Sequence, residues 1–383
     1  MEKVKVLSIF GTRPEAVKMA PLVKVLKNTP GVEAKICVTA QHREMLDQVL
    51  ELFGLVPDED LDIMQSNQSL TEITCRALAG LEKVIIKEKP NLILVHGDTS
   101  TTFVGSLAAF YQKVRVGHIE AGLRTFSKYS PFPEEMNRKL TGVLTDLHFA
   151  PTQRAAENLK REGVDAQTVF ITGNTVIDAL QTTVKPGYIF ENKILNNLNV
   201  PGRRIVLAEV HRRENLGRPM EEICLALKKL VHKFPDLKIV FPVHKNPRVR
   251  NIVFSMLNNT ERVFLLEPLD TADFHNLIDR SHLVLTDSGG IQEEAPSLGK
   301  PVLVLREVTE RPEAVEAGTV RLVGTDRERI YEETAHLLLN GDDYLNMAQA
   351  VNPYGDGRAS LRIRDIILYS FNLLNELPRP FSP

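Results

Sequence analysis

Residues 4–21, VKVLSIFGTRPEAVKMAP, contain the unit from which the rest of the chain is built. An apolar run of strand length, Val4–Phe10, ends in a glycine turn, and a helical pattern follows with Pro14 at a favoured first-turn position. Arg13 and Lys18 lie one to two helical turns apart, so both could reach an anion at this helix N-terminus. A helix entry with solvated charges explains the same residues, so the stretch indicates the fold before it indicates a chemistry.

Short apolar runs alternate with longer helical patterns along the whole chain. Several runs, such as IVL and LVL, are apolar throughout, which favours parallel strands buried on both faces. Between them, the pattern of residues 69–89 places Leu70, Ile73, Ala77 and Leu81 on one helical face. This alternation predicts an α/β fold with doubly wound sheets. The predicted strands are Val4–Phe10, Ala34–Thr39, Asn91–His96, Val114–Glu120, Leu147–Ala150, Val169–Thr172, Ile205–Val210, Lys238–Val243, Val263–Leu266, Leu283–Thr286, Val302–Leu305 and Val320–Val323.

The length of 383 residues predicts two domains of about 150–200 residues each. Residues 182–204, TTVKPGYIFENKILNNLNVPGRR, hold two Pro-Gly dipeptides and many polar side chains, and a new β–α series follows. We expect one Rossmann-like domain over residues 1–175 and a second over 176–358, with a helix over about 359–378 returning to the first. Ligands of such folds bind beyond the carboxyl ends of the strands, so a cleft between the two domains is the expected site.

Composition limits the classes of function. Hydrophobic residues make up 43% of the chain and the formal net charge is −2, so neither a nucleic-acid surface nor a polybasic membrane patch is indicated. The cysteines Cys37, Cys75 and Cys224 are widely spaced, which argues against a disulfide framework and favours a reducing cytoplasm. The sequence contains no signal-peptide pattern and no run of about 20 apolar residues, so we expect a soluble protein without membrane insertion.

In the first half, polar residues follow the predicted strands. Asp98 lies between a strand and a helix in VHGDTSTTF (95–103), where an N-cap is as good an interpretation as a catalytic role. Residues 119–139, IEAGLRTFSKYSPFPEEMNRK, then place Glu120, Glu134 and Arg138 in one strand-end loop and helix start. A loop so rich in acids is unusual for solvation alone. We expect these groups to converge over the same sheet edge as Asp98.

In the second half, VHRRENLG (210–217) places His211 and Arg212 at a strand end, and VHKNPRVR (243–250) repeats the theme with His244. A lone histidine is more often structural than catalytic. A histidine followed by two arginines at a strand end is a better candidate for phosphate binding or for a general acid.

The segment TDSGGIQEEAPSLGKPVL (286–303) is a strand, a glycine turn and a helix. Ser288, Gly289 and Gly290 would present a hydroxyl and backbone N–H groups to a pyrophosphate at the helix N-terminus. Glu294, in the first turn, could accept hydrogen bonds from ribose hydroxyls. The competing interpretation is an ordinary glycine turn followed by helix-favourable acids.

Motifs that the sequence lacks narrow the chemistry further. There is no GxGxxG after a strand and no GxxxxGK[ST], so neither bound NAD nor a P-loop is supported. HExxH motifs and Cys/His clusters are missing, so no metal is expected. No GxSxG is present, which argues against an ordinary serine hydrolase. The sequence therefore predicts an enzyme without a cofactor that acts on an anionic ligand.

Taken together, these segments resemble the non-hydrolysing bacterial UDP-N-acetylglucosamine 2-epimerases. The motifs follow the family's order from residue 8 to about residue 326: GTRPEAVKMAP, HGDTSTT, EAGLRT with SPFPEEMNR, HRRENLG, PVHKNP, EPLD with DFHNL, TDSGGIQEEAPSLGKPVLVLR and ERPEAVEAGT. The resemblance implies a glycosyltransferase-B-like architecture with UDP in the cleft. The implied reaction converts UDP-N-acetylglucosamine to UDP-N-acetylmannosamine, reversibly.

The resemblance also implies site residues. Its catalytic groups match Asp98, Glu120, Glu134 and His211, and its UDP-sugar contacts match Arg13, Lys18, Arg138, His211, Phe274, Ser288, Gly289, Gly290, Glu294 and Arg311. Regulation by a second substrate molecule would use Gln41, Arg212 and His244. A homodimer is likewise implied. The chain departs from the family at Glu209, where a small or hydroxylated residue is more usual, and at Lys245, a variable position.

The chemistry fits without a redox cofactor. The sugar's C2 proton is not acidic, so inversion needs oxidation at a neighbouring carbon or elimination of UDP across C1–C2. Elimination requires a carboxylate base, groups that hold the departing diphosphate, and a second acid/base. We expect a 2-acetamidoglucal intermediate, with Glu120 or Asp98 as the base, Glu134 assisting and His211 stabilising the pyrophosphate. The alternatives are a hydrolysing 2-epimerase that releases N-acetylmannosamine, a UDP-sugar glycosyltransferase, and a non-catalytic nucleotide-sugar sensor.

Overall fold

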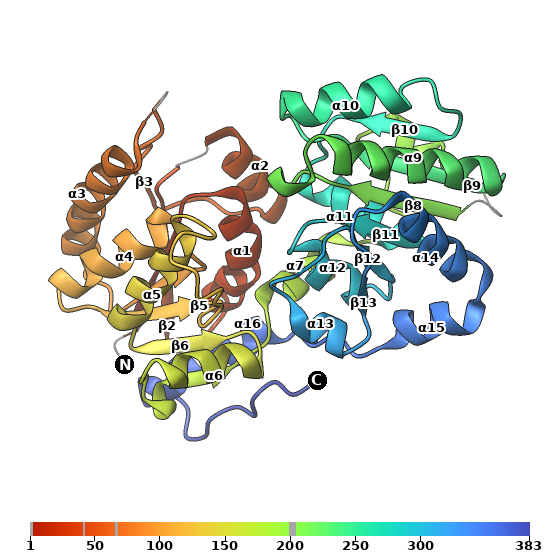
Figure 1. Ribbon diagram of the computed structural model, residues 1–383. Helices are drawn as coiled ribbons and strands as arrows, with labels where there is room; N and C mark the ends of the chain where they lie inside the picture. The colour runs from red at the N-terminus through yellow and green to blue at the C-terminus, as the bar shows by residue number, and fades with distance from the viewer. Residues whose placement is uncertain (1–2, 41–42, 66–67, 199–203) are drawn as a thin grey trace. The chain divides into compact units, whose positions relative to one another are not determined.

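The computed structural model describes residues 3–40, 43–65, 68–198 and 204–383. Its contacts divide the chain into two compact units. Unit 1 comprises Met1–Thr182 and Tyr354–Pro383, and unit 2 comprises Thr183–Pro353. Figure 1 shows the helices and strands of each unit. Within the described ranges, no helix has the length and apolar character needed to cross a bilayer.

Unit 1 is built on a seven-stranded parallel sheet with the order β3-β2-β1-β4-β5-β6-β7 among the described residues. Its strands are β1 (Val4–Phe10), β2 (Val32–Val38), β3 (Glu59–Asp60), β4 (Leu92–His96), β5 (Arg115–Ile119), β6 (Leu147–Ala150) and β7 (Val169–Ile171). Its helices are α1 (Arg13–Lys27), α2 (Arg43–Phe53), α3 (Leu70–Glu88), α4 (Ser100–Tyr111), α5 (Glu134–Leu144), α6 (Gln153–Arg161), η1 (Ala166–Thr168), α7 (Thr175–Thr183) and α16 (Ala359–Ser370).

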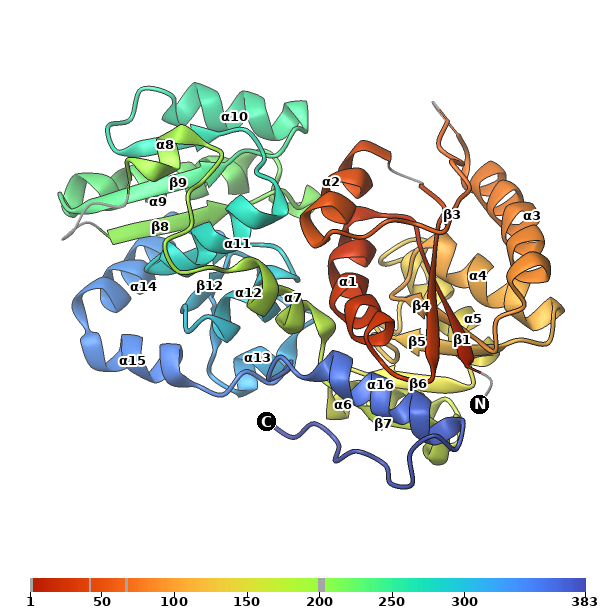
Figure 2. The ribbon, with the colours of Figure 1, turned by 180° about the vertical axis from the view of Figure 1, so that it is seen from behind.

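Alternate residues of the central strands supply two separate cores. Val6 and Phe10 of β1 pack with apolar residues of α1, α2 and α16, whereas Leu7 and Ile9 pack with residues of α3 and α4. Figures 1 and 2 show α3 and α4 on one side of the sheet and α1 and α16 on the other. All four β1 side chains are fully buried, and each such side chain contributes about 1.5–3 kcal/mol to folding. This explains why the strand is apolar on both faces.

The C-terminal helix α16 packs on α1 in unit 1 and buries Ile363 and Ile367 there. Its first turn is held by Asp178 of α7, whose carboxylate accepts from the N–H groups of Ala359 (3.2 Å) and Ser360 (2.7 Å). The helix ends at Ser370, so residues 371–378 of the predicted span are not helical.

Unit 2 repeats the architecture with a six-stranded parallel sheet, order β10-β9-β8-β11-β12-β13, among the described residues. Its strands are β8 (Arg204–Glu209), β9 (Leu237–Pro242), β10 (Val263–Leu266), β11 (Leu283–Thr286), β12 (Val302–Val304) and β13 (Val320–Leu322). Its helices are α8 (Lys193–Asn196), η2 (Arg213–Asn215), α9 (Arg218–Lys233), α10 (Pro247–Leu257), α11 (Thr271–Arg280), α12 (Ile291–Ser297), α13 (Pro312–Glu316), α14 (Arg327–Leu339) and α15 (Gly341–Gln349).

The predicted α/β class is confirmed, and every predicted strand is present with ends shifted by at most two residues. One strand, β3, was missed. It has two residues, both acidic, and pairs only with β2 at the sheet edge, so no apolar pattern marks it. The change of unit after Thr182 falls inside α7, at the start of the polar segment 182–204. A cleft shared by the domains stays a prediction.

Candidate active site

Both sheets reverse their winding direction at one point. In unit 1 it lies between β1 and β4, and in unit 2 between β8 and β11. Ligands of doubly wound sheets bind at the carboxyl ends of such strands. The residues that follow these strands, and those that follow the neighbouring β5, are therefore where each unit can carry a site.

The turn from β1 to α1 is held by Glu15, a residue that the sequence analysis did not single out. The Glu15 carboxylate is buried and accepts from the N–H groups of Gly11 (3.0 Å) and Thr12 (2.8 Å) and from the Thr99 hydroxyl (2.7 Å). Gly11 is required because a Cβ there would lie 2.0 Å from the Thr39 hydroxyl oxygen. Glu15 thus joins the turn after β1 to the start of α4.

Glu120 follows β5 in a left-handed backbone conformation, with φ of +63°, and its side chain is 9% exposed. Its Oε2 is bonded to the Lys18 ammonium, accepts from Asn174 Nδ2 (2.8 Å) and lies 3.6 Å from His96 Nε2. Burial raises the pKa of the Glu120 carboxyl, but the charge of Lys18 and the His96 ring outweigh burial and hold the pKa well below its usual range. Glu120 is therefore ionised at neutral pH.

Asp98 is tied to the start of α5. Its carboxylate accepts from Arg138 Nη2 (2.6 Å), and its backbone carbonyl accepts from Asn137 Nδ2 (2.9 Å). The N-cap interpretation of Asp98 is wrong, because the cap of α4 is Thr99, whose hydroxyl accepts from the Thr102 N–H. The Asp98 carboxylate is available for another role.

Glu134 and Glu135 begin α5 and differ sharply in their surroundings. Glu135 is fully buried and accepts from the N–H groups of Thr125 and Phe126, both at 3.0 Å. Glu134 has a buried Oε2 with no hydrogen-bond partner in the part of the chain that is described. Glu135 therefore holds the preceding loop, whereas Glu134 keeps an oxygen that a ligand could use. Together with Arg138, these contacts connect the ends of β4 and β5 to α5.

In unit 2, Asp287 organises the turn after β8. Its buried carboxylate accepts from the backbone N–H of His211 (3.0 Å) and of Arg212 (2.9 Å) and from Asn215 Nδ2 (2.8 Å). Burial raises the pKa of Asp287, and the hydrogen bond from Arg212 and the charge of His211 oppose that shift. Neither Asp287 nor Asn215 was recognised from the sequence, although both lie inside quoted motifs.

His211 is held between side chains of three elements. Its Nδ1 lies 2.5 Å from Glu209 Oε1, and its ring stacks on His244 with centroids 5.4 Å apart. Burial lowers the pKa of His211, but the hydrogen bond and charge of Glu209 raise it above the usual value overall. Burial and the charge of His211 lower the pKa of His244.

The turn Ser288–Gly290 is flanked by cations and by one acid. A Cβ on Gly289 would lie 3.7 Å from Arg212 Nη2 and 3.9 Å from Arg311 Cζ, and a Cβ on Gly290 would lie 3.4 Å from Glu294 Oε1. Gly290 has an ordinary helical φ of −64°, so glycine is needed here for access to the backbone rather than for its conformation. This arrangement suits an anion bound against the turn.

The remaining contacts of this region fix the side chains around the turn. Arg311 is bonded to the buried Glu293 carboxylate, which holds its guanidinium in place. Glu294 Oε2 lies 3.9 Å from His275 Nε2. Phe274, on α11, is partly buried next to His275 in the chain, and Arg13 is the partly exposed first residue of α1.

One group in the described ranges, Glu209 with His211 and Asp287, has the residue types and spacing of a cation site. The oxygens of Asp287 already accept from two backbone N–H groups and the Asn215 amide, and His211 Nδ1 is bonded to Glu209. A metal would need those same lone pairs. The donor set therefore fits a hydrogen-bonded cluster and does not fit a metal.

The structure brings the predicted residues into two clusters. The unit 1 cluster consists of two bonded groups, one of Asp98 with Arg138 and Glu135 and one of Glu120 with Lys18, His96 and Asn174. The sequence did not indicate His96, Asn174 or Glu135 as site residues. His211, Arg212, His244, Ser288, Gly289, Gly290, Glu294 and Arg311 gather at the carboxyl edge of the unit 2 sheet. Gln41 lies outside the described residues.

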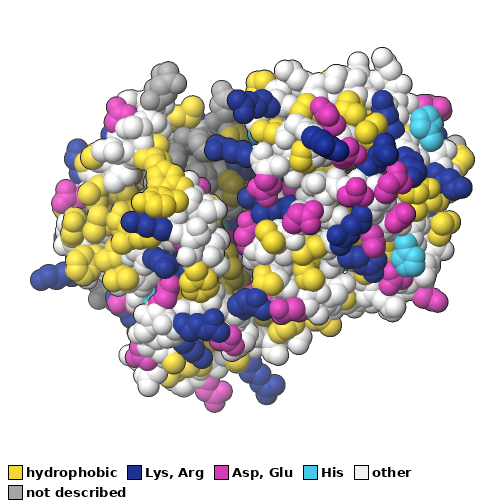
Figure 3. Space-filling view, viewed as in Figure 1, with side chains coloured by type: hydrophobic (Ala, Val, Ile, Leu, Met, Phe, Trp, Pro, Cys, Tyr) yellow, Lys and Arg dark blue, Asp and Glu magenta, His cyan; other side chains and the backbone are white. Residues whose placement is uncertain are grey.

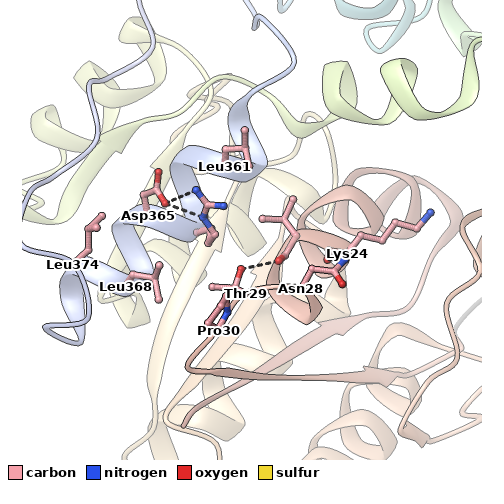
Figure 4. Close-up of a pocket in the computed structure, with 10 residues that line it drawn as sticks. Lys24, Asn28, Thr29, Pro30, Leu361, Asp365, Leu368 and Leu374 are labelled. Atoms are coloured by element: carbon pink, nitrogen blue, oxygen red, sulfur yellow. Dashed lines mark hydrogen bonds and ion pairs between the residues drawn. The ribbon is translucent and has the colours of Figure 1, made fainter. Parts of the chain in front are cut away.

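A groove of about 560 Å³ lies elsewhere in unit 1, between the C-terminal end of α1 and α16 (Figure 4). Lys24, Leu361 and Leu368 are among the residues that line it, and the Arg364–Asp365 pair lies on its wall. The C-terminal end of α1 is at the edge of the sheet opposite to the carboxyl ends of the strands. The groove is therefore separate from the polar clusters.

Two doubly wound parallel sheets, each with a polar cluster at its carboxyl edge, give the chain a glycosyltransferase-B-like fold, as in structures solved for UDP-N-acetylglucosamine 2-epimerases. A family model described as UDP-N-acetylglucosamine 2-epimerase matches residues 24–368. The UDP-N-acetylglucosamine 2-epimerase of Bacillus subtilis (strain 168) is 54% identical over 382 residues and both chains are covered completely. The chain therefore belongs to the UDP-N-acetylglucosamine 2-epimerase family, and the predicted family and enzyme class are confirmed.

Solved structures agree with this assignment. An S. aureus protein in complex with UDP has a TM-score of 0.90 and 50% identity, with both chains covered completely. The UDP-GlcNAc 2-epimerase of Neisseria meningitidis, bound to UDP-GlcNAc, has a TM-score of 0.87 and 50% identity, covering 95% of this chain and 100% of that one.

Proposed function

We propose that the protein converts UDP-N-acetylglucosamine to UDP-N-acetylmannosamine, reversibly, by eliminating UDP and adding it back to 2-acetamidoglucal. The observation that supports the proposal is that the two units carry different kinds of charged side chain at their sheet edges. Carboxylates gather at the sheet edge of unit 1, and two guanidiniums with a histidine flank an open glycine turn in unit 2. Similar proteins have been solved with UDP and with UDP-GlcNAc bound.

Elimination accounts for inversion at C2 with balanced atoms. A carboxylate removes the C2 proton, the C–H electron pair forms the C1–C2 double bond, and the C1–O bond breaks with its electrons going to UDP. A proton is then delivered to the opposite face of C2 while the diphosphate oxygen adds to C1. Arg212, Arg311 and His211 would stabilise the charge on the departing diphosphate, which is where electrostatic stabilisation is worth most.

The roles of the carboxylates follow from their surroundings. A base must be ionised, and Lys18 and His96 keep Glu120 in that state. Asp98, paired with Arg138, is the alternative base. Glu134 is suited to the second proton transfer, because its buried Oε2 has no hydrogen-bond partner within the described residues.

The test is proton NMR of UDP-N-acetylglucosamine incubated with the protein in deuterium oxide. We expect UDP-N-acetylmannosamine and deuterium at C2 of both sugars. Free N-acetylmannosamine without its UDP form would establish the hydrolysing alternative instead, and turnover only after an acceptor is added would establish a glycosyltransferase. Binding of UDP without any turnover would establish the non-catalytic nucleotide-sugar sensor. Glu120→Gln should abolish exchange at C2, whereas Glu51→Gln, on the exposed face of α2, should not.

We propose that the product supplies the synthesis of cell-surface polysaccharides in the cytoplasm. An activated amino sugar is a donor for glycosyl transfer, and such donors are made where UDP-sugars are available. The three cysteines are free and two of them, Cys37 and Cys224, are buried, which suits a reducing compartment. Deleting the gene and finding an unchanged polysaccharide sugar composition would contradict this proposal.

A homodimer through α4 and α5 of unit 1 is also proposed. Phe110 and Tyr111 are 58% and 59% exposed at the end of α4, and Val143 is 85% exposed on the adjacent α5. Figure 3 shows hydrophobic side chains gathered over these helices. Exposed apolar side chains grouped in this way are suited to contact with a second copy of the same surface. Light scattering should give a dimer that Val143→Asp converts to a monomer; a wild-type monomer would refute the interface.

Regulation by a second substrate molecule remains a proposal for Arg212 and His244. Both touch the proposed diphosphate site, since Arg212 lies beside Gly289 and His244 stacks on His211. A ligand held by them would change the placement of His211. Initial rates should then depend on substrate concentration with a sigmoidal curve, and a hyperbolic curve would argue against the proposal.

A further inference from the structure

Glu209 connects the glycine turn to His211 through a chain of hydrogen bonds. It is the last residue of β8, and its side chain is 16% exposed. Its Oε1 lies 2.5 Å from His211 Nδ1, and its Oε2 accepts from the Thr286 hydroxyl at 3.1 Å. The Thr286 oxygen in turn accepts from the Ser288 N–H at 3.0 Å. One carboxylate therefore touches both the histidine and the strand end that carries Ser288–Gly290.

We propose that Glu209 is a positioning residue for His211, which keeps the ring protonated at both nitrogens so that Nε2 donates a hydrogen bond to the diphosphate of the nucleotide-sugar. This inference rests on the proposed function. It adds a residue that acts through His211 and does not itself touch the substrate.

The hydrogen-bonding rules of the imidazole ring support the proposal. An ionised carboxylate only accepts, so Nδ1 must carry a proton when it faces Glu209. In the neutral ring Nε2 would then present a lone pair, which an anionic diphosphate repels. In the imidazolium form Nδ1 donates to Glu209 and Nε2 donates outward. The carboxylate thus selects the charged ring, the only form that satisfies both neighbours.

The other groups that face His211 are consistent with a charged ring. Asp287 Oδ1 lies 3.8 Å from His211 Nδ1 and adds a second negative charge from the turn after β11. Burial and the charge of Arg212 lower the pKa of His211, but the contact with Glu209 raises it by more, so the pKa is raised overall. His244, stacked on the ring from the turn after β9, has a lowered pKa and therefore stays neutral.

The test compares Glu209→Gln with Glu214→Gln in the full-length protein. The side-chain amide introduced by Glu209→Gln can still accept from Nδ1–H and donate to the Thr286 oxygen, so the variant removes the charge and keeps the contacts. Glu214 is three residues beyond His211 in the same segment but pairs with Arg306 at 2.8 Å, so it controls for the loss of one acid. The His211 ring is titrated by NMR with labelled histidine, assigned through its absence in His211→Asn. UDP binding is measured by calorimetry at pH 6 and pH 8.

We expect the pKa of His211 to fall by about one to two units in Glu209→Gln and to stay unchanged in Glu214→Gln. UDP binding by Glu209→Gln should differ less from wild type at pH 6 than at pH 8, because the higher proton concentration charges a larger share of the rings. At pH 8 it should weaken by about tenfold, and the alkaline limb of kcat/KM should move to lower pH.

Two results would overturn the inference. One is a His211 pKa in Glu209→Gln within about 0.3 unit of the wild-type value. The other is a lowered pKa without any loss of UDP affinity at pH 8, which would show that Nε2 does not serve the diphosphate. Neither measurement uses catalysis. A protein that binds UDP and shows the shift but never epimerises would therefore refute the proposed function while leaving the role of Glu209 intact.

Discussion

Replacing Glu135 by Gln should loosen the loop that leads into α5, although the two side chains have the same shape. Glu135 is fully buried, and its two oxygens accept from different backbone groups. Oε1 accepts from Phe126 N–H and Oε2 from Thr125 N–H, both at 3.0 Å, with Arg138 Nη1 at 3.4 Å from Oε2. A glutamine amide has one oxygen. Whichever way it turns, its NH₂ faces a backbone N–H that cannot reverse its direction.

The magnitude follows from that geometry. Leaving one buried N–H unsatisfied costs about 1–3 kcal/mol, and the surviving bond loses the roughly twofold strength that a charged acceptor gives it. Phe126 adds to the effect because its φ of +61° costs about 1–2 kcal/mol, which Glu135 now helps to offset. We expect the opening free energy of the loop to fall by about 3 kcal/mol, which is about a hundredfold in the opening equilibrium.

Amide hydrogen exchange is the appropriate assay, because the amides of Thr125 and Phe126 are themselves the donors. Both should exchange about a hundred times faster in Glu135→Gln. Amides of the unit 2 sheet should be unaffected. Glu134→Gln is the matched control: it is the same substitution one residue away, and Glu134 Oε2 has no hydrogen-bond partner among the described residues. We expect that variant to keep the loop's protection while losing activity.

The reasoning would be refuted if Thr125 and Phe126 kept their wild-type protection in Glu135→Gln. It would also fail if Glu134→Gln accelerated their exchange equally, since the Glu134 carboxylate makes no bond to either amide. Loss of protection throughout unit 1 would mean that the loop does not open independently of the sheet.

Three further predictions concern the strands and the turns that follow them. Gly11→Ala should destabilise unit 1 by about 1–3 kcal/mol in urea unfolding, because the new Cβ would collide with the Thr39 hydroxyl. Gly341→Ala is the control and should be neutral or slightly stabilising, because a Cβ there has open space around it. Equal effects of the two substitutions would contradict this reasoning. Burial lowers the pKa of His118 to about 3. As the pH falls below about 6.5, this side chain therefore binds a proton in the unfolded chain but stays neutral in the folded chain. Stability should therefore drop by about 1.4 kcal/mol per pH unit in that window, and His118→Gln should remove this part of the slope in urea titrations between pH 7 and pH 4. In Asp287→Asn, an amide NH₂ faces one of the backbone N–H groups from which the Asp287 carboxylate accepts, so the turn carrying His211 should shift. UDP should then bind at least about tenfold more weakly in calorimetry, and an unchanged affinity would contradict this reasoning.

The fold could be predicted from the sequence because the patterns that indicate each strand and helix lie within the segment itself. Strands buried on both faces, such as β1 and β4, are continuous apolar runs, and the helices between them show one apolar face. The edge strand β3 lacks both signals, since edge position removes the need for apolar residues on two faces. Helix ends were also harder to predict, and α16 stops at Ser370 although apolar residues continue to Leu374.

The candidate site could be predicted only as far as strand ends identify it. Asp98, Glu120 and His211 each follow a strand, so their neighbourhood follows from topology. The partner of each could not be predicted, because contacts such as Asn174 with Glu120 join residues 54 apart. Lys18 illustrates the limit: its helical position predicted an anion at the α1 N-terminus, and the anion it meets is the Glu120 carboxylate.

That pairing bears on how the proposed base works. A carboxylate held at low pKa is a weak base in isolation, so the Lys18 contact would slow proton removal if it persisted unchanged through the reaction. Removal of a proton from C2 by Glu120 would neutralise the carboxylate that Lys18 is paired with, just as negative charge develops on the leaving diphosphate. If Lys18 then pairs with the diphosphate in place of Glu120, its charge would stabilise the eliminated state more than the bound substrate. Such a difference in stabilisation is the condition for catalysis. Lys18→Met should therefore lower kcat far more than it raises KM, and the reverse pattern would reduce Lys18 to a substrate-binding residue.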